Sequence, residues 1–155
     1  RYISIQISYS LADRTPEREM IPLCLDQGLG LIPYFPLAGG ILSGKYLSPE
    51  RVPAGSRADT DPNFKRFLQE KYIRLAQGVS RLAEERGIAP SALSLAWLLR
   101  RPAVSTVIVG ATKPEQVAEN IGCLNVPLDE ATQHILDEIS RPFIHGEPFA
   151  SYRLS

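Results

Sequence analysis

The stretch SALSLAWLLRRPAVSTVIVGATKPEQVAEN, residues 91–120, decides the fold class of this chain. Residues 91–101 are apolar on nearly every side, which predicts a deeply buried helix. The β-branched run STVIVG, residues 105–110, predicts a strand. Residues 112–115 (TKPE) have the pattern of a capping box, so a second helix follows the strand. Helix, strand and helix in succession indicate βαβ units around a parallel sheet.

Two further strands are expected upstream of this stretch. Residues 2–8 (YISIQIS) alternate between apolar and polar side chains, which is typical of a strand. Residues 29–35 (LGLIPYF) form a short apolar run bounded by turn signals, as in a buried parallel strand. Between them lies a predicted helix over residues 18–27, with a kink or a displaced start at Pro22. Apolar spacings of three and four predict one long helix over residues 64–86.

Three parallel strands are too few for a complete α/β fold, because a parallel sheet needs both faces covered and its edges occupied. The same elements fit the last part of a (β/α)₈ barrel, which typically has about 250 residues. The chain has 155 residues and begins with Arg rather than Met. We therefore expect residues 1–155 to be one part of a single barrel domain, incomplete as given.

The composition excludes several classes of function. Seventeen basic residues balance seventeen acidic ones, so bulk charge favours neither a nucleic acid nor a membrane surface as partner. No apolar run approaches the ~20 residues that span a bilayer, and the N-terminus lacks the apolar core of a signal peptide. The cysteines and histidines are isolated in sequence, which predicts reduced thiols, no metal site and a cytoplasmic protein.

The segment PLAGGILSGKYLSPE, residues 36–50, contains a near match to a phosphate-binding P-loop. Gly39, Gly44 and Lys45 have the required spacing, but Tyr46 stands where the motif needs a hydroxyl for Mg²⁺. Prolines follow instead of a helix, so a triphosphate site is not predicted. Two interpretations stay open on the local pattern: a different phosphate site, or a glycine-rich turn with a solvated lysine. The surrounding loop, residues 36–62, is long enough to be functional.

A second phosphate candidate lies where the predicted strand 105–110 meets the next helix. A helix N-terminus offers unpaired N–H groups and a partial positive charge to an anion. Gly110 would permit close approach to the backbone, Thr112 adds a hydroxyl and Lys113 a cation. One turn further along, Gln116, Glu119 and Asn120 share one side of the helix. The plainer alternative is an ordinary helix cap. No G-x-G-x-x-G motif follows a strand, so a Rossmann site is not supported.

Taken together, these segments resemble the C-terminal half of an aldo-keto reductase. The resemblance is carried by ISIQISYSLADRTPE, GLGLIPYFPLAGGILSGKY, GSRAD and ALSLAWLLRRPAVSTVIVGATKPEQVAENI, in that order, and by the closing helix. It is strongest to the branch that includes potassium-channel β subunits and bacterial general-stress-type reductases. It implies a (β/α)₈ barrel in which the three predicted strands are the sixth to the eighth. It also implies NADP(H) as cofactor and the reduction of aldehydes or ketones.

The resemblance assigns roles to individual residues. Gln6 matches a contact to the nicotinamide carboxamide, and Tyr34 matches the aromatic residue that stacks on the nicotinamide ring. The pyrophosphate and covering-loop positions are Phe35, Pro36, Leu37, Ala38, Gly39, Lys45 and Arg57. The positions for the adenosine 2′-phosphate and adenine are Gly110, Thr112, Lys113, Gln116, Glu119 and Asn120. Two residues depart from the family: Phe35 stands where many relatives have serine, and Gln116 where some have arginine.

The family's catalytic tyrosine, lysine, aspartate and histidine belong to the first half of the barrel, so no catalytic residue is assigned in this chain. We expect residues 36–62 to cover the cofactor and residues 141–155 to form the C-terminal tail. The expected partner is a small carbonyl substrate, with no nucleic acid and no membrane. Two alternatives remain: a non-enzymatic, NADPH-sensing regulatory module like a channel β subunit, and a gene fragment without function.

Overall fold

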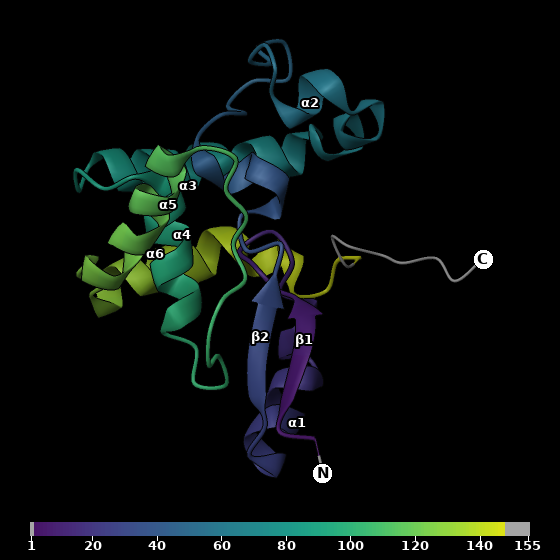
Figure 1. The fold of residues 1–155 in the computed structure, drawn as a ribbon, viewed down its shortest axis with the longest axis vertical. Helices are drawn as coiled ribbons and strands as arrows, with labels where there is room; N and C mark the ends of the chain where they lie inside the picture. The colour runs from purple at the N-terminus through teal and green to yellow at the C-terminus, as the bar shows by residue number, and fades with distance from the viewer. Residues whose placement is uncertain (1, 148–155) are drawn as a thin grey trace.

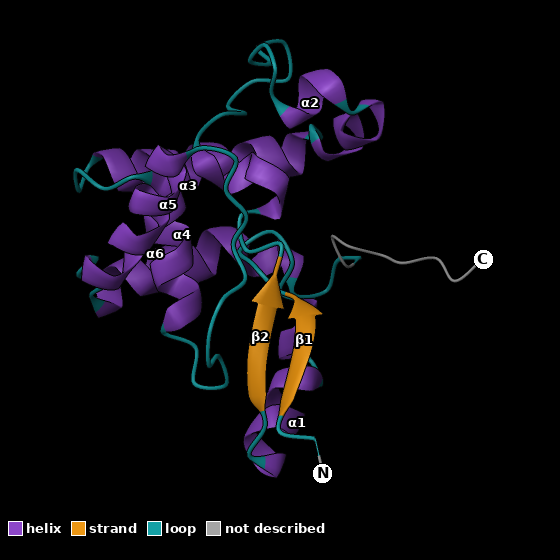
Figure 2. Ribbon diagram, viewed as in Figure 1, coloured by secondary structure: helices purple, strands orange, loops and turns teal. Residues whose placement is uncertain are grey.

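The computed structural model describes residues 2–147, and Figure 1 shows their arrangement. Two parallel strands, β1 (Ser4–Ser8) and β2 (Gly30–Tyr34), are connected through α1 (Met20–Gln27), which lies behind them in this view. The remaining α-helices are α2 (Arg57–Thr60), α3 (Glu70–Glu84), α4 (Pro90–Leu99), α5 (Pro114–Ile121) and α6 (Glu130–Ser140). Short 3₁₀ segments are η1 (Thr15–Glu17), η2 (Ala38–Ser43), η3 (Pro62–Phe67), η4 (Gly122–Asn125) and η5 (Arg141–Phe143). The described part is therefore an α/β unit with few strands and many helices (Figure 2).

The two strands confirm the alternation seen in the sequence. β1 pairs with β2 in parallel, with Gln6 opposite Ile32 and Ser8 opposite Tyr34. Directly paired residues point to the same face, and successive side chains alternate between faces. Leu31 and Pro33 are buried on one face, whereas Gln6 on the other is exposed. The sheet therefore has one face in the core and a second face, the open face, that is exposed at Gln6 and becomes covered at Ser8, which is buried.

The prediction of a third strand over residues 105–110 was wrong. This segment runs beside β2, and a single parallel bridge joins Leu31 to Val104. The ladder begins regularly, because Leu31 N donates to Ala103 O at 2.7 Å and Ser105 N donates to Leu31 O at 3.0 Å. The next ladder bond needs an N–H at Pro33, which a proline lacks. The next hydrogen bond is displaced by one residue, because Ile108 N, rather than Val107 N, donates to Pro33 O at 2.9 Å.

The predicted helix over residues 18–27 forms with a displaced start, as Pro22 suggested. α1 begins at Met20, so Pro22 falls in the first turn, where its missing N–H has no intrahelical partner to lose. Gly28 ends the helix in the left-handed conformation, with φ of 63°. The 3₁₀ segment η1, which contains Pro16, precedes the helix as a separate turn.

The prediction of one long helix over residues 64–86 was also wrong. Residues 62–67 form the 3₁₀ segment η3, and α3 starts after Gln69, which has extended backbone angles. The break turns Phe64 and Phe67 towards other aromatic rings: Phe64 contacts Tyr46 and Phe67 contacts Tyr72, with centroids 5.5 and 6.0 Å apart. The apolar spacing in this region therefore reports burial of side chains on two short elements rather than on one helix.

The buried core draws its residues mainly from η2, α3, α4 and the loop after β1, with Leu31 from β2. Residues 91–98 of α4 are all buried, as the apolar run predicted, and Trp97 is fully buried among them. Within residues 2–147, no helix combines the length and the apolar character needed to cross a bilayer.

Candidate functional site

The open face of the sheet carries the first two predicted site residues. Gln6 lies opposite Ile32, and Tyr34 lies two residues further along β2 on the same face. Gln6 is exposed and Tyr34 is half-buried. The strands thus place an amide and an aromatic ring on one face, near the C-terminal end of β2. Ligands of parallel α/β proteins bind at that end of the strands.

A compact turn follows Tyr34 directly and contains the predicted pyrophosphate residues. Four residues in it have positive φ: Phe35 (53°), Ala38 (49°), Gly39 (65°) and Gly40 (108°). Two backbone bonds close the turn, from Ala38 N to Phe35 O and from Gly40 N to Leu37 O, both at 2.9 Å. A left-handed conformation costs a non-glycine residue roughly 1–2 kcal/mol. Such strain persists where the surroundings enforce it and is concentrated at functional sites.

The lysine of the near P-loop and the tyrosine after it have different environments. Lys45 is exposed, and no described carboxylate forms an ion pair with it. Tyr46 is buried, and its hydroxyl accepts a hydrogen bond from Ala58 N at 3.3 Å. The next α-helix after Lys45 begins at Arg57, so no described helix N-terminus follows this turn as a P-loop requires. Tyr46 is a structural residue, and Lys45 remains available to an anion.

The start of α4 contacts both helix α5 and the glycine turn, which is the chain from Phe35 to Gly44. A Cβ placed on Gly44 would lie 3.2 Å from Pro90 Cγ, so the turn rests directly on the first residue of α4. Ser91, the next residue, donates a hydrogen bond to the Glu119 carboxylate. The glycine turn and α5, which carry the two predicted phosphate regions, are thereby both held against one helix end. Glu119 is engaged by this contact, and Asn120 beside it is buried.

The start of α5 differs from the predicted capping box by one residue. Lys113 rather than Thr112 is the N-cap, and Gln116 rather than Glu115 is the side chain that folds back. Gln116 Oε1 accepts from Thr112 N at 2.8 Å and from Lys113 N at 3.2 Å. The Thr112 hydroxyl lies 3.2 Å from the same oxygen. These donors, which the sequence assigned to an anion, are satisfied by a neutral amide oxygen, and an arriving phosphate would have to displace it.

Arg57 lies against aromatic rings. Its guanidinium carbon is 6.0 Å from the centre of the Phe35 ring and 5.9 Å from that of Phe64. Phe64 and Ser91 are contact residues of this region that the sequence did not single out. Their signal was weak, because a phenylalanine after a proline-rich loop and a serine after a helix-starting proline are common in any fold.

A buried ionic cluster anchors the end of β1 to α6. Arg14 donates to both carboxylate oxygens of Glu17 at 2.7 Å, and through Nη1 to Asp137 O at 2.8 Å and Ser140 Oγ at 2.9 Å. Tyr9 donates to Glu17 at 2.8 Å. Burial, reinforced by the charge of Glu17, raises the pKa of the Tyr9 hydroxyl above its usual range, so Tyr9 stays protonated. The cluster contains none of the predicted site residues and serves the fold.

The cysteines and other candidate ligands form no metal centre within residues 2–147. Cys24 and Cys123 are free thiols, and burial raises the pKa of each above its usual value. In the part of the chain that the structure describes, no three His, Cys, Asp or Glu side chains gather to hold an ion. Raised thiol pKa values mean a small thiolate fraction at neutral pH, so neither cysteine has the character of a nucleophile.

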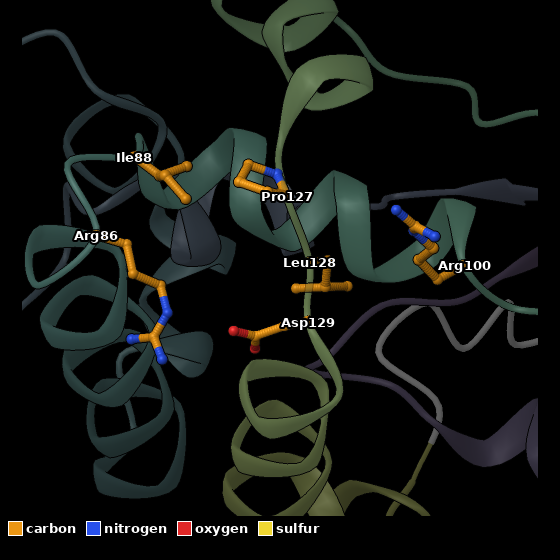
Figure 3. Close-up of a pocket in the computed structure, with 6 residues that line it drawn as sticks. All are labelled: Arg86, Ile88, Arg100, Pro127, Leu128 and Asp129. Atoms are coloured by element: carbon orange, nitrogen blue, oxygen red, sulfur yellow. The ribbon is translucent and has the colours of Figure 1, made fainter.

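A cavity of about 460 Å³ is lined by the six residues that Figure 3 labels, and none of them is a predicted site residue. Its lining residues are Arg86, Ile88, Arg100, Pro127, Leu128 and Asp129. Arg86 Nε donates to Thr132 Oγ1 at 2.9 Å, and Asp129 caps α6 by accepting from Thr132 N at 2.7 Å. Hydrogen bonds from Thr132 hold the pKa of Asp129 below its usual value. Arg86 therefore joins the end of α3 to α6, and Asp129 caps α6.

Comparison with known proteins gives a consistent result. The family model described as "Aldo/keto reductase family" matches residues 1–141. The chain is 35% identical over 136 residues to the NADH-specific methylglyoxal reductase of Escherichia coli (strain K12), covering 88% of this chain and 41% of that protein. It is 39% identical over 140 residues to a probable voltage-gated potassium channel subunit beta of Oryza sativa subsp. japonica, covering 86% and 42% respectively. The chain thus spans about two fifths of the length of these relatives.

Proposed function

Because the chain belongs to the aldo/keto reductase family, we propose that it is the cofactor-binding C-terminal part of an enzyme that reduces aldehydes or ketones. Reductases are among its relatives, including the L-glyceraldehyde 3-phosphate reductase of Escherichia coli (strain K12), 33% identical over 144 residues. In this proposal β1, β2 and the segment beside β2 are the sixth, seventh and eighth strands of a (β/α)₈ barrel. The protein would be cytoplasmic, with a small carbonyl compound as substrate.

One observation carries the proposal: Gln6 and Tyr34 share the open face of the sheet, directly before the strained turn at residues 35–40. A nicotinamide dinucleotide has an aromatic ring with a carboxamide, a pyrophosphate and an adenosine. Tyr34 offers a ring for stacking, and Gln6 offers an amide to the carboxamide. The turn supplies backbone N–H groups, with Lys45 as the cation. From the nicotinamide to the pyrophosphate, the chemical groups of the dinucleotide follow the same order as the residues that would contact them.

When bound, the nicotinamide would supply a hydride to the carbonyl carbon of the substrate. The residues of this chain would bind and orient it: Tyr34 would hold one ring face covered, and Gln6 would fix the rotation of the carboxamide. We assign no proton donor within residues 2–147, because the family's catalytic acid belongs to the first half of the barrel. The general acid of the reaction would therefore come from outside this chain.

We propose NADP(H) as the cofactor, since Lys113 and the Thr112 hydroxyl lie at the start of α5 and suit a 2′-phosphate. Two observations oppose a strict preference: Gln116 occupies the same donors, and one relative is named NADH-specific. The test compares Lys113→Ala with the unchanged protein. We expect the affinity for NADPH to fall about five- to tenfold and that for NADH to change little. Equal losses for both cofactors would contradict the 2′-phosphate assignment.

The activity is tested with 4-nitrobenzaldehyde and NADPH, following the loss of nicotinamide absorbance. We expect the gene product that contains this chain to reduce the aldehyde, and the isolated 155-residue chain to be inactive. Turnover by the isolated chain would show that its own residues supply the acid. A gene product that binds the dinucleotide without reducing any aldehyde or ketone would contradict the enzymatic proposal.

A second function is favoured by the relatives named as potassium channel β subunits, in Oryza sativa and, at 37% identity over 130 residues, in Arabidopsis thaliana. In that case the same residues would bind the dinucleotide as a signal, and the protein would regulate a partner. Dinucleotide binding without carbonyl reduction is the outcome that separates this function from the first.

A further inference from the structure

We propose that Phe35, Arg57 and Phe64 form a clamp that joins the two ends of segment 36–56 and holds it closed, so that Arg57 positions the segment over the bound dinucleotide. The consequence for the dinucleotide rests on the proposed function, whereas the clamp itself is a property of the chain. The segment begins directly after β2 and returns at Arg57, the first residue of α2.

The clamp consists of one exposed arginine whose guanidinium contacts two aromatic rings. The guanidinium carbon of Arg57 is 6.0 Å from the ring centre of Phe35 and 5.9 Å from that of Phe64. Contacts at this distance attract a cation to the electron-rich ring face. Phe35 and Arg57 lie on either side of residues 36–56, so their contact closes a loop across the segment. Within residues 2–147 no carboxylate forms an ion pair with Arg57, and its N–H groups stay available to an anion.

Two further aromatic rings hold the ring of Phe64 in place. Tyr46 and Phe67 both contact it, each with ring centres 5.5 Å away, and Phe64 is nearly fully buried. Gly39 approaches the clamp from the turn: a Cβ at this position would lie 2.6 Å from Phe64 Cε2 and 3.5 Å from Arg57 Nη1. The turn that would face the pyrophosphate therefore rests on the clamp, and a change in the clamp would be felt in the turn.

A second tie lies next to Arg57. The buried hydroxyl of Tyr46 accepts from Ala58 N at 3.3 Å, and Ala58 is fully buried. The stretch between Tyr46 and Arg57 is different, because residues 49–51 and 53–55 are all exposed. The segment is thus anchored in the core up to Tyr46 and tied again at Arg57, with an exposed strap between these two points. Its opening requires that Arg57 leave the two rings.

The backbone of Phe35 gives independent support. Phe35 has φ of 53°, a conformation that costs a residue with a side chain roughly 1–2 kcal/mol. Glycine would adopt it without this cost. The ring contacts Tyr34, with centres 5.5 Å apart, as well as Arg57, so the side chain links the proposed nicotinamide residue to the strap. The strained backbone of Phe35 thus carries a ring that contacts Arg57 on one side of the strap.

The test uses the gene product that contains this chain, with Phe35→Leu, Arg57→Gln and the double variant. Phe35→Leu keeps apolar volume and removes the ring face, and Phe35→Tyr is the matched control that keeps it. Two quantities are measured: hydrogen–deuterium exchange of residues 39–56 without dinucleotide, and the dissociation rate of NADPH after displacement by excess NADP⁺. We expect Phe35→Leu and Arg57→Gln each to raise both rates about threefold, as loss of a partly exposed cation–π contact implies. We expect Phe35→Tyr, which keeps the ring face, to leave the exchange rate near that of the unchanged protein.

The double variant distinguishes a clamp from two separate effects. If Phe35 and Arg57 act through each other, the double variant resembles the single ones. Independent multiplication of the two effects, or unchanged exchange in Phe35→Leu, would overturn the clamp. Failure of the proposed function would look different, because the unchanged protein would then bind no dinucleotide while the exchange measurement still reported on the strap. Thermal midpoints of all variants identify any that fail to fold, and Arg57→Met, which keeps an unbranched side chain without the charge, then replaces Arg57→Gln.

Discussion

At the scale of single residues, Gly28 and Gly39 show how the same backbone angle serves different purposes. Their φ values are 63° and 65°, so a side chain would be strained equally at both. Gly28 ends α1 with open space around it, whereas Gly39 approaches the Phe64 ring closely. The positive φ alone explains why glycine suits position 28. At position 39 the positive φ and the close contact with the Phe64 ring both favour glycine.

Alanine substitutions separate these two effects. Gly28→Ala is expected to lower the free energy of unfolding by about 1 kcal/mol, through backbone strain alone. Gly39→Ala is expected to cost at least about 1–3 kcal/mol more, because the Phe64 ring must move. Urea denaturation of the two variants measures both values. Equal losses would contradict the close contact between the turn and Phe64.

The position of a single residue could be predicted where it follows from the alternation of a strand. Alternation in residues 2–8 predicted a strand, and the structure places Gln6 of that strand on the same face as Tyr34. The cofactor roles of both residues stay predictions. The N-cap of α5 could not be predicted, since Thr112 and Lys113 differ by one position and the choice depends on where Gln116 folds back. Capping is decided by side-chain geometry that sequence patterns do not contain.

At the scale of elements, the ionic cluster at Arg14 joins β1, η1 and α6. The side chains of Arg14 and Glu17 are 6% and 20% exposed, so removal of one partner would leave a poorly solvated charge. Burial alone would lower the pKa of Arg14, but Glu17 and Asp137 raise it above its usual value, and the residue stays charged.

Arg14→Met is expected to lower the free energy of unfolding by about 3–5 kcal/mol, the usual cost of breaking a buried ion pair from one side. Arg74→Gln is the matched control, because Arg74 and Glu70 form a pair on α3 with side chains 75% and 76% exposed. That variant is expected to cost at most about 0.5 kcal/mol. Chemical denaturation compares them. Similar losses would show that the Arg14 cluster contributes little.

Pro33 explains why the segment after α4 was predicted as a strand and does not become one. The β-branched composition of residues 105–110 favours a strand, but pairing depends on the donor that β2 offers. Pro33→Val restores an N–H opposite Ser105 O. We expect the amide introduced by this substitution to be protected from hydrogen exchange as strongly as that of Leu31, with the amide of Tyr9, on the other side of β2, unchanged. Exchange of the introduced amide at the rate of a free peptide would contradict this explanation.

At the scale of the whole molecule, the resemblance in sequence predicted the family, and the family model confirms it over residues 1–141. The order of helices and strands followed from local patterns, with errors where tertiary contacts decide, as at η3. The arrangement at the end of the strands could not be predicted, because it depends on contacts between distant segments. The contact of Gly44 with Pro90 and that of Ser91 with Glu119 are examples.

The open surfaces of the molecule agree with a larger barrel as proposed. Tyr2 and Ile3, just before β1, are 87% and 81% exposed, and on α5 and η4 so are Ile121 and Leu124, at 58% and 71%. Exposed apolar side chains that lie next to one another are usually covered by another part of a protein. In the proposed barrel, the first half covers both pairs of side chains, Tyr2 with Ile3 and Ile121 with Leu124.

The central claim is that the face carrying Tyr34 receives a nicotinamide dinucleotide. Its most direct test is a titration of the gene product with NADPH, followed by nicotinamide fluorescence, for the unchanged protein, Tyr34→Ala and Tyr34→Phe. We predict saturable binding that Tyr34→Ala weakens about tenfold, through loss of ring stacking, and that Tyr34→Phe retains. Absence of binding by the unchanged protein, or equal affinity in Tyr34→Ala, would contradict the claim.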